Sequence, residues 1–211
     1  MQILYLESVD STQDYLKELI KSGKISTPVA IVAESQEAGY GSRGNIWNSL
    51  SGNLFLSFAL PISSLPKDLK LESASIYFSY ILKEMLSDSG SNIWIKWPND
   101  FYIDDKKIGW VITNIVDSDF VCGVGINTEK FPENFGKLDI EIDKNSFIET
   151  YLKNLEKCVS WKQVFSKYKL EFYRNQNFFT NKNSLRFSLG RAVLQNDGSI
   201  IVDGERIYSL R

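Results

Sequence analysis

The chain has 211 residues, 43% of them hydrophobic, which suits one large globular domain or a domain with a small appendage. Its 26 acidic and 24 basic residues leave a net charge of −2, so a broad nucleic-acid-binding surface is not expected. No apolar run reaches the length of a membrane-spanning helix, and the first residues lack the basic start and apolar core of a signal peptide. We therefore expect a cytoplasmic protein that binds neither DNA nor a membrane.

Histidine is absent, which excludes the usual Ser-His-Asp and Cys-His catalytic arrangements and most zinc sites. The two cysteines, Cys122 and Cys158, do not have a metal-binding spacing and are expected to be reduced thiols. Phosphoryl and nucleotidyl transfer can proceed without an imidazole, because they depend mainly on positioning and charge stabilisation. If the protein is an enzyme, we expect chemistry of that kind.

The first half of the chain predicts strands that alternate with helices. Asp10 followed three residues later by Gln13 is typical of a helix start, with the aspartate as N-cap. Residues 34–53 are rich in glycine and lack apolar periodicity, and loops of that length inside a compact domain are usually functional. The expected strands here are residues 3–6, 28–33 and 54–60, and the expected helices are residues 10–21 and 69–86.

The second half predicts a hairpin across Asp104–Asp105, a helical region with a break near Val159–Ser160, and a β-rich tail with an Asp-Gly turn at Asp203–Gly204. We expect an α/β (α+β) fold, with a mixed sheet and packed helices in residues 1–180 and a small β-barrel-like domain in residues 181–211. The expected strands of this half are residues 93–95, 101–103, 107–115 and 120–126, and helices are expected within residues 147–178.

A polar motif, Lys96-Trp97-Pro98-Asn99-Asp100, directly follows the buried strand at residues 93–95. It has two interpretations. Pro-Asn-Asp is good turn chemistry, and Trp97 can simply belong to the core. Alternatively, the lysine and the aspartate at the end of a strand are placed for chemistry on a bound anion.

Three further stretches have both a structural and a functional interpretation. Glycines within residues 39–44 can bring backbone N–H groups close to an anion beside Arg43, or the segment is an ordinary surface loop. Residues 123–127 end a strand with two glycines and Asn127, whose amide can read a base edge or close a turn. The hydroxyls of Ser11–Thr12 can bind a small polar ligand or cap a helix.

These stretches occur together in one order along the chain. The order is Asp-Ser-Thr, Gln-x-x-Gly-x-Gly-x-Arg-Gly, Gly-Asn-Leu-x-Leu-Ser, Lys-Trp-Pro-Asn-Asp, Lys-Ile-Gly and Gly-x-Gly-Ile-Asn. Over nearly its whole length the chain resembles the biotin protein ligase family, with Lys-Trp-Pro-Asn-Asp as the most specific element. The resemblance implies a class II aminoacyl-tRNA synthetase-like catalytic domain followed by an SH3-like β-barrel.

The resemblance also implies a two-step reaction. Biotin and ATP, with Mg²⁺, give biotinyl-5′-AMP and pyrophosphate, and a lysine of a carrier protein then attacks the mixed anhydride and releases AMP. The implied carrier is the biotin carboxyl carrier protein of acetyl-CoA carboxylase, and the ligase would be a monomer or a homodimer. No helix-turn-helix region precedes Asp10, so we expect a monofunctional ligase without operator binding.

The family's functional residues map onto matching positions of this sequence. The implied catalytic residues are Lys96, Arg43 and Asp100, and Asp100 either orients Lys96 or helps to hold Mg²⁺. The implied biotin-binding residues are Ser11, Thr12, Gln13, Gln36, Gly39, Tyr40, Gly41, Ser57 and Lys107. The implied ATP- and adenylate-binding residues are Ser42, Arg43, Trp47, Lys96, Asn99 and Asn127.

The sequence departs from the family pattern at four positions. Tyr40 and Ser42 replace arginines that are common in the glycine loop, and Trp110 and Asn114 stand where a glycine and a glutamate are expected. These departures leave two alternatives open. One is a lipoate or octanoate ligase or transferase of the same fold, and the other is a non-catalytic sensor of biotin or a nucleotide.

Overall fold

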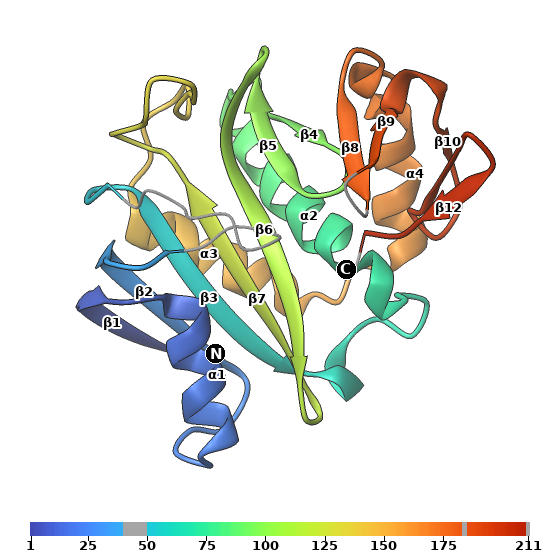
Figure 1. Cartoon of the computed structure of the whole chain (residues 1–211). Coiled ribbons are helices and arrows are strands. Elements are labelled where there is room, and N and C mark those ends of the chain that lie inside the picture. Colours follow the sequence, from blue (N-terminus) through green and yellow to red (C-terminus); the bar gives the residue numbers. More distant parts are fainter. Residues whose placement is uncertain (40–49, 183–184, 210–211) are drawn as a thin grey trace.

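The structure, a computed structural model, describes residues 1–39, 50–182 and 185–209. Its centre is a seven-stranded mixed sheet in the order β1-β2-β3-β7-β6-β5-β4 (Figure 1). Strands β1 and β2 pair in parallel and the other neighbours pair antiparallel, which confirms the expected mixed sheet. The strands are β1 (Gln2–Val9), β2 (Val29–Gln36), β3 (Leu54–Pro61), β4 (Trp94–Lys96), β5 (Asp100–Ile103), β6 (Lys106–Val116) and β7 (Asp119–Ile126).

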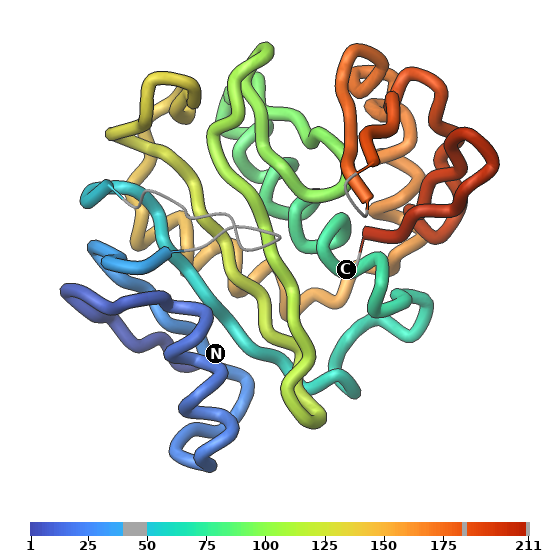
Figure 2. The backbone as a smooth tube through the Cα atoms, in the orientation of Figure 1, coloured from blue at the N-terminus to red at the C-terminus, as the bar shows by residue number. Residues whose placement is uncertain are grey.

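Helices cover the two faces of this sheet unequally, as Figures 1 and 2 show. Helices α2 and α3 lie on one face, where the main hydrophobic core forms, and α4 packs against α2. Helix α1 lies on the other face, and its Leu16 packs on Ile31, Ala59 and Val121. The helices are α1 (Thr12–Lys21), α2 (Ala74–Asp88), α3 (Lys144–Glu156) and α4 (Trp161–Glu171), with short 3₁₀ turns η2 (Ile62–Ser64), η3 (Leu71–Ser73), η4 (Phe172–Asn175) and η5 (Leu189–Arg191).

The start of α1 differs from the expectation by one residue. The N-cap is Ser11, whose hydroxyl accepts a hydrogen bond from the Asp14 N–H at 3.3 Å, so the prediction of Asp10 as N-cap is wrong. Serine and aspartate cap helices about equally well, and the sequence alone does not choose between neighbours. The shift has a consequence for Gln13, which lies in the first turn with its side chain buried instead of closing a capping box.

The tail forms short strands, as expected, but they belong to two separate sheets among the described residues. The expected SH3-like barrel is therefore not confirmed. Buried side chains of the tail, including Phe187 and Ile200, join the same hydrophobic cluster as the helices. The tail strands are β8 (Phe179–Lys182), β9 (Leu185–Ser188), β10 (Val193–Leu194), β11 (Ile200–Val202) and β12 (Glu205–Ile207).

Two buried indoles attach the turn at residues 195–199 to the rest of the molecule. Trp97 is fully buried, and its Nε1–H donates to the Gly198 carbonyl at 2.8 Å while its backbone N–H donates to Asn175 Oδ1 at 2.7 Å. Trp161 Nε1–H donates to the Asn196 carbonyl at 2.9 Å. Trp97 is thus a core residue, as one interpretation of its motif required, and it also joins the tail to the central sheet.

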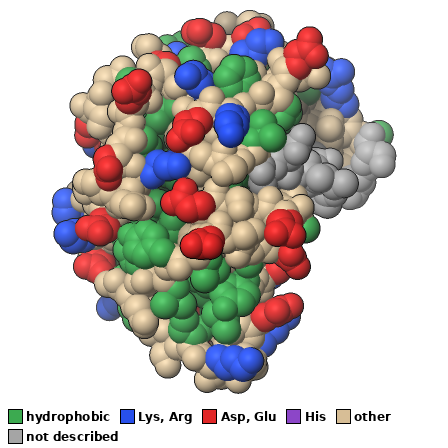
Figure 3. All heavy atoms as spheres, turned by 90° about the vertical axis from the view of Figure 1, so that its left-hand side faces the viewer, with side chains coloured by type: hydrophobic (Ala, Val, Ile, Leu, Met, Phe, Trp, Pro, Cys, Tyr) green, Lys and Arg blue, Asp and Glu red, His purple; other side chains and the backbone are tan. Residues whose placement is uncertain are grey.

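The surface beside the edge strand β1 carries charges of both signs. Figure 3 shows acidic and basic side chains interspersed over the upper part of this face, and hydrophobic side chains gathered in the lower part. The mixture agrees with the small net charge of −2. Within the described ranges, none of the helices has the length and hydrophobicity that crossing a bilayer requires.

We expect Trp97→Phe to destabilise the protein, because the smaller phenyl ring lacks the indole N–H and leaves the Gly198 carbonyl without its buried donor. Loss of one partner of a buried hydrogen bond typically lowers the free energy of unfolding by about 1–3 kcal/mol. Urea unfolding would measure the change, with Trp161→Phe as the matched variant that removes the neighbouring bond to Asn196. A Trp97→Phe protein that unfolds at the wild-type urea concentration would contradict this anchoring role.

Candidate active site

A small pocket lies on the α1 face of the sheet, next to the first turn of that helix. The empty space in the pocket and at its open mouth is about 280 Å³. One part of its wall carries hydroxyl and amide groups, and the other part is apolar. The lining residues are Ser11, Thr12, Gln13, Gln36, Ser57, Trp110, Ile112, Gly123, Val124 and Gly125.

The polar part of the wall is one connected hydrogen-bond network. Thr12 donates from its backbone N–H and its hydroxyl to Gln36 Oε1, at 2.8 and 2.9 Å, and its hydroxyl lies 2.9 Å from the Ser57 hydroxyl. Ser57 donates to Gln13 Oε1 at 3.1 Å, and Gln13 Nε2 donates to Asn114 Oδ1 at 3.1 Å. The network holds both donors and acceptors in place, which suits an uncharged polar ligand group that needs both.

A glycine in the middle of the sheet makes room for this network. Gly123 of β7 is paired with Ser57 on one side and Ile112 on the other. A Cβ atom at Gly123 would lie 2.6 Å from Gln13 Oε1, too close for any real contact. The glycine therefore lets the Gln13 side chain descend from α1 onto the sheet between the neighbouring strands.

Beside the pocket, the carboxylate of Asp100 binds two ammonium groups. Its Oδ1 lies 2.6 Å from Lys107 Nζ, and its Oδ2 lies 3.4 Å from Lys96 Nζ. The three side chains are between 15% and 24% exposed, so water only partly screens these charges. Burial alone would raise the pKa of Asp100, but Lys107 and then Lys96 outweigh it and hold the pKa below its ordinary value of 3.8.

The register of the sheet brings this ion-pair group to the pocket. Lys96 is paired with Asp100 across β4 and β5, and Asp100 is paired with Trp110 across β5 and β6. Trp110 is paired with Gly125 of β7, and Gly125 with Phe55 of β3. Residues directly opposite in a sheet point to the same face, so these five positions form one row that runs from the lysine to the pocket.

A β-bulge places Lys107 beside this row. The register between β5 and β6 shifts after Phe101, which leaves Ile108 as an extra residue on β6. Ile108 is fully buried in the core under α2, while Lys107 reaches Asp100 on the other face, the face of Trp110. Without the bulge, simple alternation would put Lys107 and Trp110 on opposite faces, because they are three residues apart.

Two predicted nucleotide contacts are engaged within the protein. Asn99 is buried, and its Nδ2 donates to the Val111 carbonyl, which ties the motif to β6. Asn127 has no exposed surface, and its Nδ2 donates to the Gly136 carbonyl at 2.9 Å. Their roles with ATP stay predictions that need these side chains to exchange partners.

The glycine loop falls largely outside the described residues. Gly39, at its start, is described and buried. The remaining predicted contacts of the loop lie outside the described residues, and they are Tyr40, Gly41, Ser42, Arg43 and Trp47.

Sequence reasoning found only part of what the structure brings to the pocket. It gave Ile112 no role, and it expected Trp110 to reshape the rim of the pocket and Gly123 to leave room for a ligand beside the backbone. Trp110, Ile112 and Asn114 alternate along β6 and share the pocket's face, and Gly123 supplies the space for Gln13. Trp110 and Asn114 stood out only as departures from a family pattern. The one signal in the sequence was the spacing of these residues at every second position of β6, which puts them on one face. That spacing identifies a site only when the pairing of β6 with β7 is known.

The described residues do not form a resident metal site. Within residues 1–39, 50–182 and 185–209, no group of three or more His, Cys, Asp or Glu side chains could hold a metal ion. Asp100, the one predicted Mg²⁺ ligand, has a lysine on each carboxylate oxygen. A role in orienting the two lysines fits this geometry better than a role as a metal ligand.

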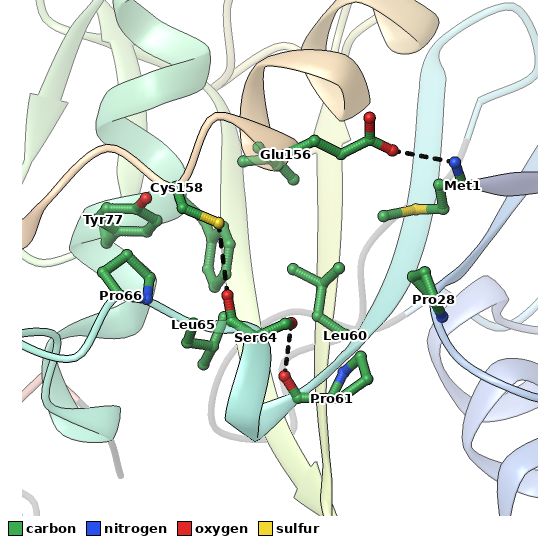
Figure 4. Close-up of a pocket in the computed structure, with 12 residues that line it drawn as sticks. Met1, Pro28, Leu60, Pro61, Ser64, Leu65, Pro66, Tyr77, Glu156 and Cys158 are labelled. Atoms are coloured by element: carbon green, nitrogen blue, oxygen red, sulfur yellow. Dashed lines mark hydrogen bonds and ion pairs between the residues drawn. The ribbon is translucent and has the colours of Figure 1, made fainter.

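A larger pocket lies on the opposite face, between the sheet and helices α2 and α3 (Figure 4). The empty space in this pocket and at its open mouth is about 700 Å³, and its wall is mostly hydrophobic. Its polar groups already have partners, since Cys158 Sγ donates to the Ser64 carbonyl at 3.5 Å and Tyr77 donates to the Val159 carbonyl at 2.7 Å. Without convergent polar groups aimed into it, this pocket is not the candidate active site.

Comparison with known proteins agrees with the fold. The profile of the Biotin/lipoate A/B protein ligase family matches residues 5–127, more than half of the chain, and the protein belongs to this family. The bifunctional ligase/repressor BirA of Escherichia coli (strain K12) is 29% identical over 170 residues, which are 72% of this chain and 52% of that protein. The chain thus spans about half the length of this curated relative.

Solved structures resemble the whole chain. The biotin acetyl coenzyme A carboxylase synthetase of Helicobacter pylori, crystallised with bound biotinylated ATP, is 39% identical with a TM-score of 0.93, covering 98% of this chain and 99% of that one. The biotin protein ligase of Aquifex aeolicus, in complex with biotin and ATP, is 22% identical with a TM-score of 0.78, covering 100% and 96%. The second likeness concerns the fold alone.

We expect the pKa of the Asp100 carboxyl group to lie below its ordinary value of 3.8 in the folded protein. Because the folded pKa is lowered, its ion pairs stabilise the fold above the ordinary pKa, and this stabilisation is lost as the pH falls through the folded pKa. Lys107→Met should raise this pKa more than Lys96→Met, since Lys107 is the closer cation. Carbon-detected NMR titration measures both shifts.

The exposed neighbour Lys106 provides the control, because Lys106→Met removes a cation of the same strand that makes no ion pair with Asp100. That variant should leave the Asp100 titration where it is in the wild type. An unchanged Asp100 midpoint in Lys107→Met would show that the ion pair does not hold the carboxylate charged.

Proposed function

We propose that the protein is an ATP-dependent biotin protein ligase, which forms biotinyl-5′-AMP and then transfers biotin to a lysine of a carrier protein. The observation that carries the proposal is the group of Lys96, Asp100 and Lys107 on the same sheet face as the polar pocket. The likeness to the Helicobacter pylori synthetase supports it, because that protein was crystallised with biotinylated ATP.

The polar network suits the head group of biotin. A cyclic urea has two N–H donors and one carbonyl acceptor, and it carries no charge. Thr12, Gln13, Gln36 and Ser57 present hydroxyl and amide groups of both kinds in a small space. We place the urea there, which directs the carboxylate at the other end of biotin toward the two lysines.

In the first step, an oxygen of the biotin carboxylate attacks the α-phosphorus of ATP, and the bond to pyrophosphate breaks. Negative charge builds on the phosphoryl oxygens in the transition state, and the Lys96 ammonium is placed to stabilise it by a charge-assisted hydrogen bond. Lys107 binds the carboxylate end of the substrate. Mg²⁺ enters with the ATP phosphates as part of the substrate.

Asp100 acts as the positioning residue for both lysines. It holds two long, flexible side chains in defined places before substrate binds, which reduces the conformational entropy lost on binding. In the second step, the ε-amine of the carrier lysine attacks the acyl carbon and AMP leaves. The bond from the acyl carbon to the phosphate oxygen breaks as the amide forms, and the amine loses its proton to the solvent. The Lys96 ammonium stabilises the negative charge on the departing AMP.

The polar wall also weighs against the alternatives. A saturated octanoyl chain has no donor or acceptor at its far end, so it would offer no hydrogen bond to the hydroxyls and amides of Thr12, Gln13 and Ser57 that line the pocket. A non-catalytic sensor would have no need of two lysines held beside the pocket. Biotin ligation therefore explains more of the site than either alternative.

The partners follow from the same proposal. We infer that the acceptor is the biotin carboxyl carrier part of acetyl-CoA carboxylase, a reading supported by the name of the Helicobacter pylori protein. We also propose that the protein works in the cytoplasm as a monomer or a homodimer, and that it does not bind operator DNA. A gel shift with operator-type DNA would contradict the last point.

We expect Lys96→Met to lower the rate of carrier biotinylation about 10²–10³-fold, because the transition state loses a preorganised charged donor. Purified protein, biotin, Mg-ATP and an apo carrier domain would be mixed, and intact-mass spectrometry would follow the gain of one biotin. Lys106→Met is the matched control, since it removes an exposed lysine of β6 that lies outside the ion-pair group.

The proposal requires that the wild type modify the carrier only when ATP is present and that the control keep its rate. A wild type that leaves the carrier unmodified by biotin but attaches lipoate or octanoate would replace the proposal with the first alternative. A wild type that binds biotin and modifies nothing would favour the sensor.

A further inference from the structure

The indole of Trp110 covers Gly125 in the wall of the pocket. Gly125 lies in β7 between Phe55 of β3 and Trp110 of β6. A Cβ atom at Gly125 would lie 2.6 Å from both Cη2 and Cζ3 of Trp110, so the six-membered ring of the indole lies directly over this glycine. Trp110 and Phe55 belong to one small hydrophobic cluster, and both are almost fully buried.

The indole lies between the two polar parts of the site. On one side is the next row of the sheet, where the Gln13 side chain lies over Gly123 and Gly123 is paired with Ser57. On the other side, Lys107 Nζ lies 5.9 Å from the centre of the Trp110 ring. A ligand with its polar head at Gln13 and its carboxylate at Lys107 must therefore pass its apolar middle along the indole.

We propose that Trp110 is a specificity-determining residue, which limits the bulk that the acyl substrate can carry between its head group and its carboxylate. This inference rests on the proposed biotin ligase function. The indole is a rigid plate fixed between the glycine beneath it and Phe55 beside it, so a larger ligand cannot easily displace it. Its face gives the thioether ring and aliphatic chain an apolar surface.

A purely structural role for Trp110 predicts something different. The main hydrophobic core lies on the opposite face of the sheet, and Trp110 is instead part of the pocket wall with Ile112 and Gly125. If the indole only supported the fold, its truncation would change stability and all substrates alike. If it limits bulk, its truncation changes the ranking of substrates.

The test compares biotin with biotin sulfone, which carries two extra oxygens on the ring sulfur. For wild type and Trp110→Ala, ATP–pyrophosphate exchange gives kcat/KM for each acid, and calorimetry without ATP gives each Kd. We expect the sulfone-to-biotin ratio of kcat/KM to rise about 10-fold or more in Trp110→Ala, the scale on which an apolar pocket responds to small changes in volume.

The glycine supplies a matched control. In the Trp110→Ala background, Gly125→Ala puts a methyl group into the space that the indole occupied, and the ratio should fall back toward the wild-type value. If Trp110→Ala does not fold, Trp110→Phe makes the same comparison with a smaller opening, and a smaller rise in the ratio is expected.

The possible failures are distinguishable. A variant that keeps activity with biotin while the ratio stays at the wild-type value overturns the role of Trp110 and leaves the ligase function intact. A wild type that neither binds biotin nor exchanges pyrophosphate in its presence overturns the proposed function. The role of Trp110 in selecting the acyl substrate is then overturned as well.

Discussion

Antiparallel pairing aligns one residue from each of five strands, and the site depends on this alignment. Lys96, Asp100, Trp110, Gly125 and Phe55 come from five strands, yet they form one row on one face of the sheet. A slip of one residue in any of these pairings would send the side chains beyond it into the core under α2. The residues between those of the row point to the opposite face and are buried in the main core. Burial of these residues therefore fixes the register that places the polar side chains of the site.

The bulge on β6 solves a problem that regular alternation cannot. Asp100 pairs with two cations, Lys96 and Lys107. The strand that supplies Trp110 to the pocket also supplies Lys107, three residues earlier, to the same face of the sheet. The extra residue, Ile108, resets the alternation and goes into the core, where its burial stabilises the irregular geometry. Two ammonium groups and one carboxylate then leave one net positive charge beside the pocket, which favours an anionic substrate before any phosphate is bound.

Sequence reasoning identified what lies close together along the chain and missed what pairing brings together. Lys96 and Asp100 are four residues apart, so their partnership was visible in the motif. Gln36 and Ser57 entered only through a family resemblance, because their contact with Thr12 depends on tertiary structure. The strands and helices followed from hydrophobic periodicity, whereas the N-cap of α1 and the closure of the tail depended on choices between nearly equal local alternatives.

The tail bears on the chemistry through the residue next to Lys96. Trp97 follows this lysine directly. Its indole and its backbone N–H are held by Gly198 and Asn175, which lie 101 and 78 residues further along the chain. A side chain can be positioned only as well as the backbone that carries it. The buried indole therefore fixes the end of β4 against the turn at residues 195–199, and the direction of the Lys96 side chain depends on contacts far from the pocket. Packing of the tail against Trp97 therefore helps to place the Lys96 ammonium group.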